Sequence, residues 1–419
     1  MDGTANKLLD GVRVVESASL LNGDTLGMLL GDLGADVIKV ESPGRGDYLR
    51  DFMGQITPHH SPAHLQVNRN KRSVAIDVRT DAGRDAFWRL LDTADVFVDG
   101  NAGGATDRLG IGYDSQRQRN PRIVFASVTG FGLLGPYHSI PTHGMMMTAL
   151  AGANPVARTE DGLMRPVPSS GLGGTERGGE ATTAAAVHAA LQVCAALYAR
   201  ERTGLGCHID VAGSDAVIAQ AMVSVIYALN DSRLTDRSSL PTIDGGVWTG
   251  AKYQFYETSD HKIVMLAAIE DKFWRSFCEA IGRTDLADSD NSATGGVDFG
   301  KDETALRAEL DKIFAGHDQE HWTDLAVRQR IPIGPVPGTI AEMADDRHIK
   351  ARSIIVDGDH PGAGPFTYVG SPAVIDGAPF TVRRPAPALG EHTDEVLSEL
   401  GYEAEELRAL AADRVIGGI

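Results

Sequence analysis

Cysteine is scarce in this chain of 419 residues, which contains Cys194, Cys207 and Cys278 and no others. Three cysteines at these spacings provide neither a disulfide framework nor the ligand pairs of a structural metal site, so we expect free thiols, no bound metal and a reducing compartment. A run of about 18 apolar residues is also missing, and residues 1–9 lack the apolar stretch of a secretory signal. The sequence therefore predicts a cytoplasmic protein that is neither exported nor membrane-spanning.

Positive charge is also in short supply, since 39 Lys and Arg face 57 Asp and Glu and leave a formal net charge of −18 at pH 7. Such a field repels polyanions and argues against a nucleic-acid partner. The densest basic cluster is Asn68-Arg69-Asn70-Lys71-Arg72. Two interpretations remain open: a solvated strand end, or, together with Arg79 and Arg108, a site for the phosphates of a nucleotide-like ligand.

Short β-branched runs alternate with amphipathic stretches between residues 12 and 130. The runs cover residues 12–15, 37–40, 74–76, 96–98 and 123–125, and the clearest helical patterns cover 24–33 and 82–91. Strands that alternate with helices indicate βαβ units with right-handed crossovers. The first part of the chain is therefore predicted to be an α/β domain with a Rossmann-like parallel sheet.

The pattern changes in the second half of the chain. Residues 153–180 are rich in Gly, Pro and Ser and indicate a loop, whereas 181–202 are typical of a buried core helix and precede a strand at 207–211. A strand, strand, helix pattern then spans 245–287, and an acidic helix is expected over 393–411.

A chain of this length exceeds what one hydrophobic core usually serves. We predict a large α/β domain over 1–225, completed by 370–419, and a smaller α+β domain over 245–345, with linkers at 226–244 and 346–369.

Glycines of the segment Gly130-Phe131-Gly132-Leu133-Leu134-Gly135 match the dinucleotide-binding pattern and follow an expected strand. Pro136 comes next and no helical pattern begins there, so a pyrophosphate would lack the helix N-terminus that the motif requires. We interpret the segment as a flexible loop, or lid, over a site.

Several segments in order along the chain resemble the signatures of the class III CoA-transferases (CaiB/BaiF type), whose relatives include formyl-CoA transferases and α-methylacyl-CoA racemases. The segments are 9–14 (LDGVRV), 33–41 (LGADVIKVE), 68–73 (NRNKRS), 94–98 (ADVFV), 120–122 (NPR), 200–204 (RERTG), 359–361 (DHP) and 389–393 (LGEHT). The resemblance implies an interlocked homodimer whose α/β domain binds CoA, with acyl-CoA and carboxylic acids as substrates and no permanently bound cofactor. It places CoA contacts at Ser19, Leu20, Asn22, Ser42, Ile76, Arg79, Gly100, Asn101, Arg108 and Leu109.

The catalytic carboxylate that the resemblance implies is an Asp just before the helix that ends at residues 200–204. Counting back without gaps gives Thr182, and the nearest carboxylate is Glu180, with Glu176 four residues further back. We predict that Glu180 is the nucleophile, which forms an anhydride and then a thioester with CoA. The structural alternative is that Glu180 only stabilises the start of the following helix.

His143 lies where the racemases carry a catalytic His, and its titration range suits proton transfer. The resemblance therefore leaves three hypotheses. The first is CoA transfer with Glu180 as nucleophile and His143 as a polar or acid–base partner. The second is racemisation with His143 and Glu180 as opposed bases, and the third is a non-catalytic acyl-CoA-binding protein, motivated by the missing Asp. The run 145–147 of three methionines is interpreted as a buried helix face or the lining of an acyl pocket.

Overall fold

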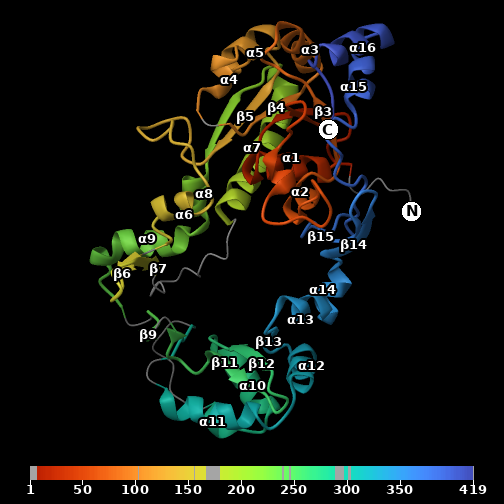
Figure 1. Cartoon of the computed structure of the whole chain (residues 1–419). Coiled ribbons are helices and arrows are strands. Elements are labelled where there is room, and N and C mark those ends of the chain that lie inside the picture. Colours follow the sequence, from red (N-terminus) through yellow and green to blue (C-terminus); the bar gives the residue numbers. More distant parts are fainter. Residues whose placement is uncertain are drawn as a thin grey trace. The chain divides into compact units, whose positions relative to one another are not determined.

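The structure, a computed structural model, describes residues 7–101, 103–154, 156–166, 180–237, 240–244, 247–287, 297–300 and 303–418. These residues divide into two units (Figure 1). The first contains residues 7–166, 180–222 and 351–418 among those described, and the second contains the described part of 223–350.

A six-stranded parallel sheet forms the centre of the first unit, in the order β3-β2-β1-β4-β5-β8. The strands are β1 Arg13–Ser17, β2 Asp36–Glu41, β3 Lys71–Ala75, β4 Val96–Asp99, β5 Val124–Thr129 and β8 His208–Ala212. Val14 of β1 pairs with Val37 on one side and with Val96 on the other. The strand order therefore reverses at β1, and the carboxyl ends of β1 and β4 flank the topological switch point of the sheet.

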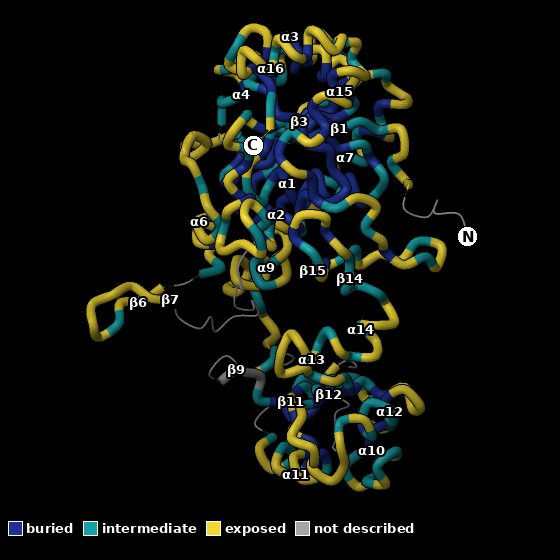
Figure 2. The backbone as a smooth tube through the Cα atoms, turned by 45° about the vertical axis from the view of Figure 1, so that its right-hand side comes forward, coloured by how far each residue is buried: buried dark blue, intermediate teal, exposed yellow. Residues whose placement is uncertain are grey.

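Helices cover both faces of this sheet. The helices of the first unit are α1 Leu21–Asp32, α2 Pro62–Val67, α3 Asp81–Leu91, α4 Ala105–Arg108, α5 Tyr113–Arg119, α6 Met145–Leu150, α7 Glu180–Thr203, α8 Gly213–Gln220, α15 Thr393–Glu399 and α16 Ala404–Ala412, with a 3-10 turn η1 Tyr48–Asp51. One apolar layer joins α1 and α7 to the sheet through residues such as Leu26, Ala185 and Val96. The other joins α3 and α15 to it through Phe87, Phe97 and Val396. Strands β1 to β5 are accordingly largely buried on both sides (Figure 2), as parallel strands are. The edge strand β8 is not, since His208 and Asp210 are exposed.

The second unit has its own core and a three-stranded antiparallel sheet, β11-β12-β13. Its elements are β9 Ile243–Asp244, β10 Val247–Trp248, β11 Tyr253–Glu257, β12 Ile263–Ala267, β13 Ile333–Val336, α10 Asp271–Ala280, α11 Thr304–Phe314, α12 Gln319–Gln329, α13 Ile340–Asp345, η2 Asp231–Arg233 and η3 Thr284–Leu286, with α9 Met222–Asn230 and α14 Arg347–Arg352 at its ends. Trp274, Phe277, Phe314 and Trp322 are buried together in its core. The predicted fold class, a parallel α/β sheet with a smaller α+β part, is confirmed.

Three predicted segments differ from the structure. The acidic helix expected over 393–411 is two helices, because Gly401 adopts φ 88° and Glu403 begins α16 with a capping box to Glu406. The loop expected over 153–180 contains the hairpin β6 Val156–Arg158 and β7 Met164–Pro166, and residues 167–179 lie outside the described residues. A second hairpin, β14 Ile355–His360 and β15 Gly364–Val369, occupies much of the segment proposed as a linker.

One helix among the described residues, Ala181–Thr203, has the length and apolar composition of a membrane span. Its alanines 184, 185, 186 and 189 are buried at 0–1% exposure in the layer against the sheet. This packing is that of a core helix, in agreement with the interpretation of residues 181–202.

Candidate active site

The predicted CoA contacts all follow the carboxyl ends of parallel strands. Ser19, Leu20 and Asn22 follow β1, Ser42 follows β2, Ile76 and Arg79 follow β3, and Gly100, Asn101, Arg108 and Leu109 follow β4. The carboxyl ends of parallel strands meet at one edge of a sheet, and open α/β sheets bind ligands there, at the switch point. The structure thus places these residues on four neighbouring strand ends at the edge where a ligand is expected.

The loops after β1 and β4 approach each other closely at the switch point. The Gly100 N–H donates to the Ser17 carbonyl at 3.1 Å, and the Asn101 side-chain amide donates to the same carbonyl at 2.9 Å. A Cβ at Gly23 or at Gly100 would lie 2.3 or 2.6 Å from the Cβ of Ala18. Only glycine fits at these two positions, so Gly100 has a packing role whatever it binds.

Asp99 organises the turn after β4 and was not among the predicted residues. Its carboxylate accepts hydrogen bonds from the Asn101 N–H (3.0 Å), the Asn101 side-chain amide (3.0 Å) and the Thr106 hydroxyl (2.9 Å). Burial raises the pKa of Asp99 above its usual value. An acid at the end of a predicted strand, followed by Gly, is the sequence signal that would have found it.

Arg108 and Arg79 differ in whether the guanidinium is already paired with a carboxylate. Arg79 is 72% exposed and its guanidinium already pairs with Asp77 at 2.8 Å. Arg108 is exposed at the end of α4, and no carboxylate of the described part of the chain lies within ion-pair distance of it. Arg108 is therefore the better placed of the two to pair with a phosphate.

The basic cluster over residues 68–72 is neither a solvated strand end nor a phosphate site, which corrects both interpretations. Arg69 pairs with Asp32 at 2.7 Å, Lys71 with Glu16 at 2.8 Å, and Arg72 with Asp36 at 2.6 Å as well as with Glu395 and Glu399. The three cationic side chains are only 0–8% exposed. Their carboxylate partners are distant in sequence, so the pairing is visible only in the folded chain.

A second buried ion network supports the ends of β2 and β3. Burial alone would raise the pKa of Glu41, but Arg50, at 2.7 Å, and Lys39 outweigh it and lower that pKa to about 2. Burial, together with the neighbouring Arg50 guanidinium, lowers the pKa of His64 to about 3. Glu41 also accepts from the hydroxyl of Ser73 on β3 at 2.6 Å, which ties the two strand ends together.

The glycine loop predicted as a lid begins where β5 ends. The Leu133 N–H donates to both carboxylate oxygens of Asp210, at 3.1 and 2.9 Å, while Leu134 is 85% exposed. No helix begins within residues 130–144, so the segment lacks the helix N-terminus of a dinucleotide site, as predicted.

His143 lies two residues before the start of α6 and is exposed. Its carbonyl accepts from the Met146 N–H at 2.8 Å and so helps to begin the helix. Met147 is 1% exposed and packs closely against Gly213, where an added Cβ would lie 2.3 Å from the Met147 sulfur. Met145, in contrast, is 61% exposed. The buried-face interpretation of the methionine run therefore holds for Met147 but not for Met145. Asn22 also approaches the Met147 sulfur, at 4.0 Å, which links the loop after β1 to the helix after His143.

Glu180 is the first residue of α7. At the other end of this helix, Arg200 pairs with Asp95, which precedes β4, at 2.9 Å. The helix therefore runs antiparallel to the strands, with its first turn toward their carboxyl ends. Helix α7 also contacts α6 and α8. Thr182, the position given by counting without gaps, is 6% exposed. Glu176 lies outside the described residues.

The sequence of the chain also matches a known protein family. Residues 9–393 match the family described as CoA-transferase family III. The chain belongs to CoA-transferase family III.

Relatives of this CoA-transferase family member are similar over nearly their whole length. A succinyl-CoA:mesaconate CoA-transferase of Haloarcula hispanica is 33% identical over 404 residues, which cover 94% of this chain and 96% of the relative. A formyl-CoA:oxalate CoA-transferase of Rhodopseudomonas palustris is 31% identical over 427 residues, 94% of each chain.

Solved structures show the same similarity. A hypothetical protein from Mycobacterium tuberculosis has a TM-score of 0.73 at 28% identity, covering 93% of this chain and 99% of that one. A CaiB/BaiF family protein from Brucella suis has a TM-score of 0.70 at 27% identity, covering 94% and 99%. The predicted family resemblance is confirmed.

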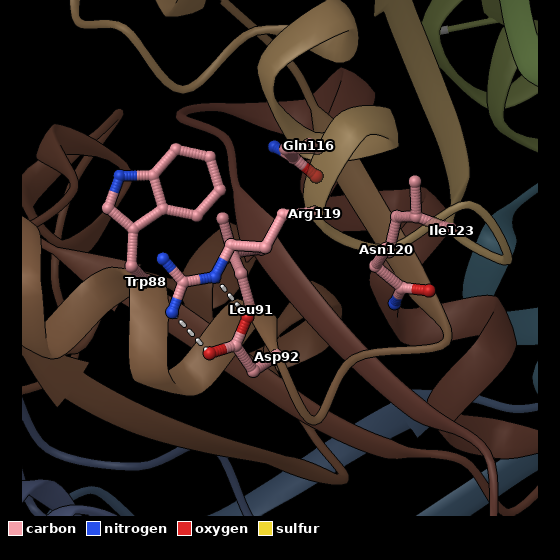
Figure 3. Close-up of a pocket in the computed structure, with 7 residues that line it drawn as sticks. All are labelled: Trp88, Leu91, Asp92, Gln116, Arg119, Asn120 and Ile123. Carbon is pink, nitrogen blue, oxygen red and sulfur yellow. Dashed lines mark hydrogen bonds and ion pairs between the residues drawn. The ribbon is translucent and has the colours of Figure 1, made fainter.

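Two cavities of this family III chain lie at the amino edge of the sheet, opposite the carboxyl ends of its strands. One is lined by Trp88, Leu91, Asp92, Gln116, Arg119, Asn120 and Ile123 (Figure 3). Its volume of about 10 Å³ is close to that of a single water site. The other, about 300 Å³, is lined by residues before β1, β2 and β3 and by Arg383 and Arg384. Neither cavity contains a predicted CoA contact, so the carboxyl edge remains the candidate site.

Among the described residues, neither the cysteines nor the other potential metal ligands form a second candidate catalytic or metal site. Burial raises the pKa of Cys194, Cys207 and Cys278 above the usual value, which makes each a poor nucleophile. Within the described ranges, no three His, Cys, Asp or Glu side chains are arranged to hold a metal ion.

Proposed function

We propose that this protein transfers CoA from an acyl-CoA donor to a carboxylic acid acceptor. The observation that carries the proposal is the match to CoA-transferase family III over residues 9–393, with named transferases at 31–33% identity over nearly the whole chain. The position of the predicted CoA contacts at the carboxyl ends of β1, β2, β3 and β4 supports it. Small carboxylic acids such as those in the relatives' names are the acceptors to test first.

The proposed chemistry uses the enzyme carboxylate twice. The Glu180 carboxylate attacks the thioester carbon, the C–S bond breaks, and CoA thiolate leaves behind a mixed anhydride. The thiolate then attacks the Glu180 carbonyl of this anhydride, which releases the donor acid and forms an enzyme thioester. The acceptor carboxylate attacks that thioester, CoA leaves again, and its attack on the acceptor carbonyl gives the new acyl-CoA and restores Glu180. Neither an oxidant nor a metal is needed for this balance.

His143 is proposed as a polar or acid–base partner in these steps. It precedes α6, which contacts α7, the helix that begins with Glu180. Arg108 is proposed to pair with a phosphate of CoA through charge-assisted hydrogen bonds. The loops that contain Ser19 and Asn101 would then border the rest of the cofactor-like substrate, with no permanently bound cofactor.

We also propose that the enzyme works in the cytoplasm as an interlocked homodimer. An apolar stripe on the outer face of α7 supports the dimer, since Val187, Leu191 and Tyr198 are 48%, 62% and 69% exposed. They recur at intervals of four and seven residues, so they lie on one side of the helix. Exposed apolar side chains on one side of a helix are typical of a protein interface.

The test is turnover with pairs of substrates. Succinyl-CoA and formyl-CoA serve as donors, mesaconate and oxalate as acceptors, and chromatography measures each acyl-CoA in the presence and absence of the acceptor acid. The proposal predicts a new acyl-CoA that requires the acceptor and disappears in Glu180→Gln. Deuterium incorporation at Cα of a 2-methylacyl-CoA in D₂O without any acceptor would instead indicate the racemase. Binding of CoA without turnover of any pair would indicate the non-catalytic alternative.

A further inference from the structure

The loop after β1 contains a residue in an unfavourable backbone conformation. Leu20 has φ 62° and ψ −159°, a region that is populated almost only by glycine. A residue with a side chain remains there only where its surroundings hold it, and such residues cluster at ligand-binding and catalytic sites. Leu20 lies at the switch point, between the exposed Ser19 and the first residue of α1.

A buried ion pair holds this loop on both sides of Ser19. The Lys39 ammonium donates to the Ala18 carbonyl at 3.0 Å and to the Asp47 carboxylate at 2.9 Å. Asp47 in turn accepts from the Leu20 N–H, at 3.2 and 3.1 Å to its two oxygens. Lys39 thus binds the Ala18 carbonyl before Ser19, and Asp47 binds the Leu20 N–H after it. We call Lys39 and Asp47 the loop clamp.

The charges of the loop clamp are kept in place by their neighbours. Burial alone would lower the pKa of Lys39, but Asp24, Asp47 and Glu16 outweigh it and raise that pKa well above its usual value. Burial would raise the pKa of Asp47, but Lys39 and the Leu49 N–H outweigh it and lower that pKa. Both members of the pair therefore remain ionised over the pH range in which an enzyme is assayed.

Stability alone does not account for this arrangement. Buried ion pairs contribute little net stability compared with apolar residues of the same shape, because both charges lose their hydration. Here the pair also maintains a strained conformation at Leu20, which adds to the cost. What the loop gains is a single geometry before any ligand arrives, and preorganisation of that kind strengthens binding.

We propose that Lys39 and Asp47 are positioning residues that preset the loop of residues 18–22 for the acyl-CoA substrate. The inference rests on the proposed function, because it assigns that loop to the CoA site. Neither residue touches the substrate. Without the Asp47 charge, Leu20 relaxes toward negative φ, and Ser19 and the start of α1 move away from the substrate.

The test compares two buried carboxylates. Asp47→Asn removes the clamp charge, and Asp32→Asn removes a matched charge that pairs with Arg69 at 2.7 Å near the other end of α1. We expect both variants to lower the unfolding temperature. Only Asp47→Asn should raise KM for acyl-CoA, by about 10- to 100-fold, with KM for the acceptor acid nearly unchanged, since a displacement on the order of 1 Å has effects of this size. An active, folded Asp47→Asn enzyme with wild-type KM for acyl-CoA would overturn the clamp, as would an equal rise in both variants.

Amide hydrogen exchange supplies a second measurement if Asp47→Asn does not fold. In the wild type, the Leu20 amide should be protected before CoA is added, because Asp47 already accepts its hydrogen bond. Protection that arises only after CoA is added would overturn the proposal. If the wild-type protein does not transfer CoA between any donor and acceptor tested, the proposed function is refuted. If the wild type transfers CoA but Asp47→Asn keeps a wild-type KM, only the loop clamp is refuted.

Discussion

Replacing Arg69 distinguishes a structural basic cluster from a phosphate-binding one. The Arg69 guanidinium makes a two-pronged ion pair with Asp32, at 3.1 and 2.7 Å, and the two side chains are 1% and 7% exposed. In Arg69→Met the Asp32 carboxylate keeps only the Asn70 amide at 2.8 Å. A buried charge stripped of its partner costs about 3–5 kcal/mol. Arg119→Met is the matched control, because its pair with Asp92 is 48% and 41% exposed and should contribute less than about 1 kcal/mol.

The assay combines urea unfolding with calorimetric titration of CoA. Arg69→Met should unfold at clearly lower urea than wild type or Arg119→Met, while its folded fraction binds CoA with unchanged affinity. Arg108→Ala should show the reverse: unchanged unfolding, and CoA binding weaker by about 1.5–3 kcal/mol, or about 10- to 150-fold in Kd. A stable Arg69→Met protein with weakened CoA binding would refute this reasoning and restore the phosphate-binding interpretation.

Three further predictions concern pH, the glycine loop and assembly. Unfolded His64 titrates near 6.5 and folded His64 near 3, so its contribution to stability is complete above pH 6.5 and is lost as pH falls toward 3, and a free energy of unfolding that stays constant from pH 7 to 4 would contradict this. Glu41 adds a second loss between pH 4.5 and about 2, which a free energy of unfolding that stays constant over that range would contradict. A Cβ at Gly130 would lie 1.8 Å from the Thr142 hydroxyl oxygen. Gly130→Val should therefore displace Thr142 and the adjacent His143, the proposed acid–base partner, and lower kcat/KM by about 10- to 100-fold. A variant with wild-type kcat/KM would contradict the proposed role of His143. Leu191→Glu places a charge in the exposed stripe of α7 and should shift the sedimentation coefficient from dimer toward monomer; a wild-type protein that sediments as a folded monomer at micromolar concentration would refute the dimer.

Local sequence patterns predicted most of the sheet and much less of its surroundings. The β-branched runs at 37–40 and 96–98 lie within β2 and β4 because strands buried on both faces are rich in apolar residues. The C-terminal helix was predicted as one because its leucines keep a helical period through the break at Gly401. The spacing of apolar residues does not show that one residue between them adopts a left-handed backbone conformation. The capping box at Glu403 was the signal in the sequence that a second helix begins there.

The candidate site depended on both topology and resemblance. Alternating strands and helices predict that strand ends share an edge, so loops such as the one at Asn101 come together without any knowledge of their partners. Buried charges could not be assigned in this way. Nothing near Lys71 in sequence indicates that Glu16 neutralises it, and nothing near Leu20 indicates that Asp47 holds its N–H. Ionic partners of this kind are set by packing, which the sequence specifies only through the whole fold.

The proposed mechanism requires a covalent intermediate on Glu180. The most direct measurement is intact-protein mass spectrometry of the wild type and of Glu180→Gln after brief incubation with succinyl-CoA, followed by peptide mapping. We expect a mass increase corresponding to bound CoA in the wild type, removed by hydroxylamine and mapped to Glu180. We expect no increase in Glu180→Gln, because an amide cannot form the anhydride. A wild-type enzyme that turns over without any adduct, or an adduct that persists in Glu180→Gln, would contradict the proposed mechanism.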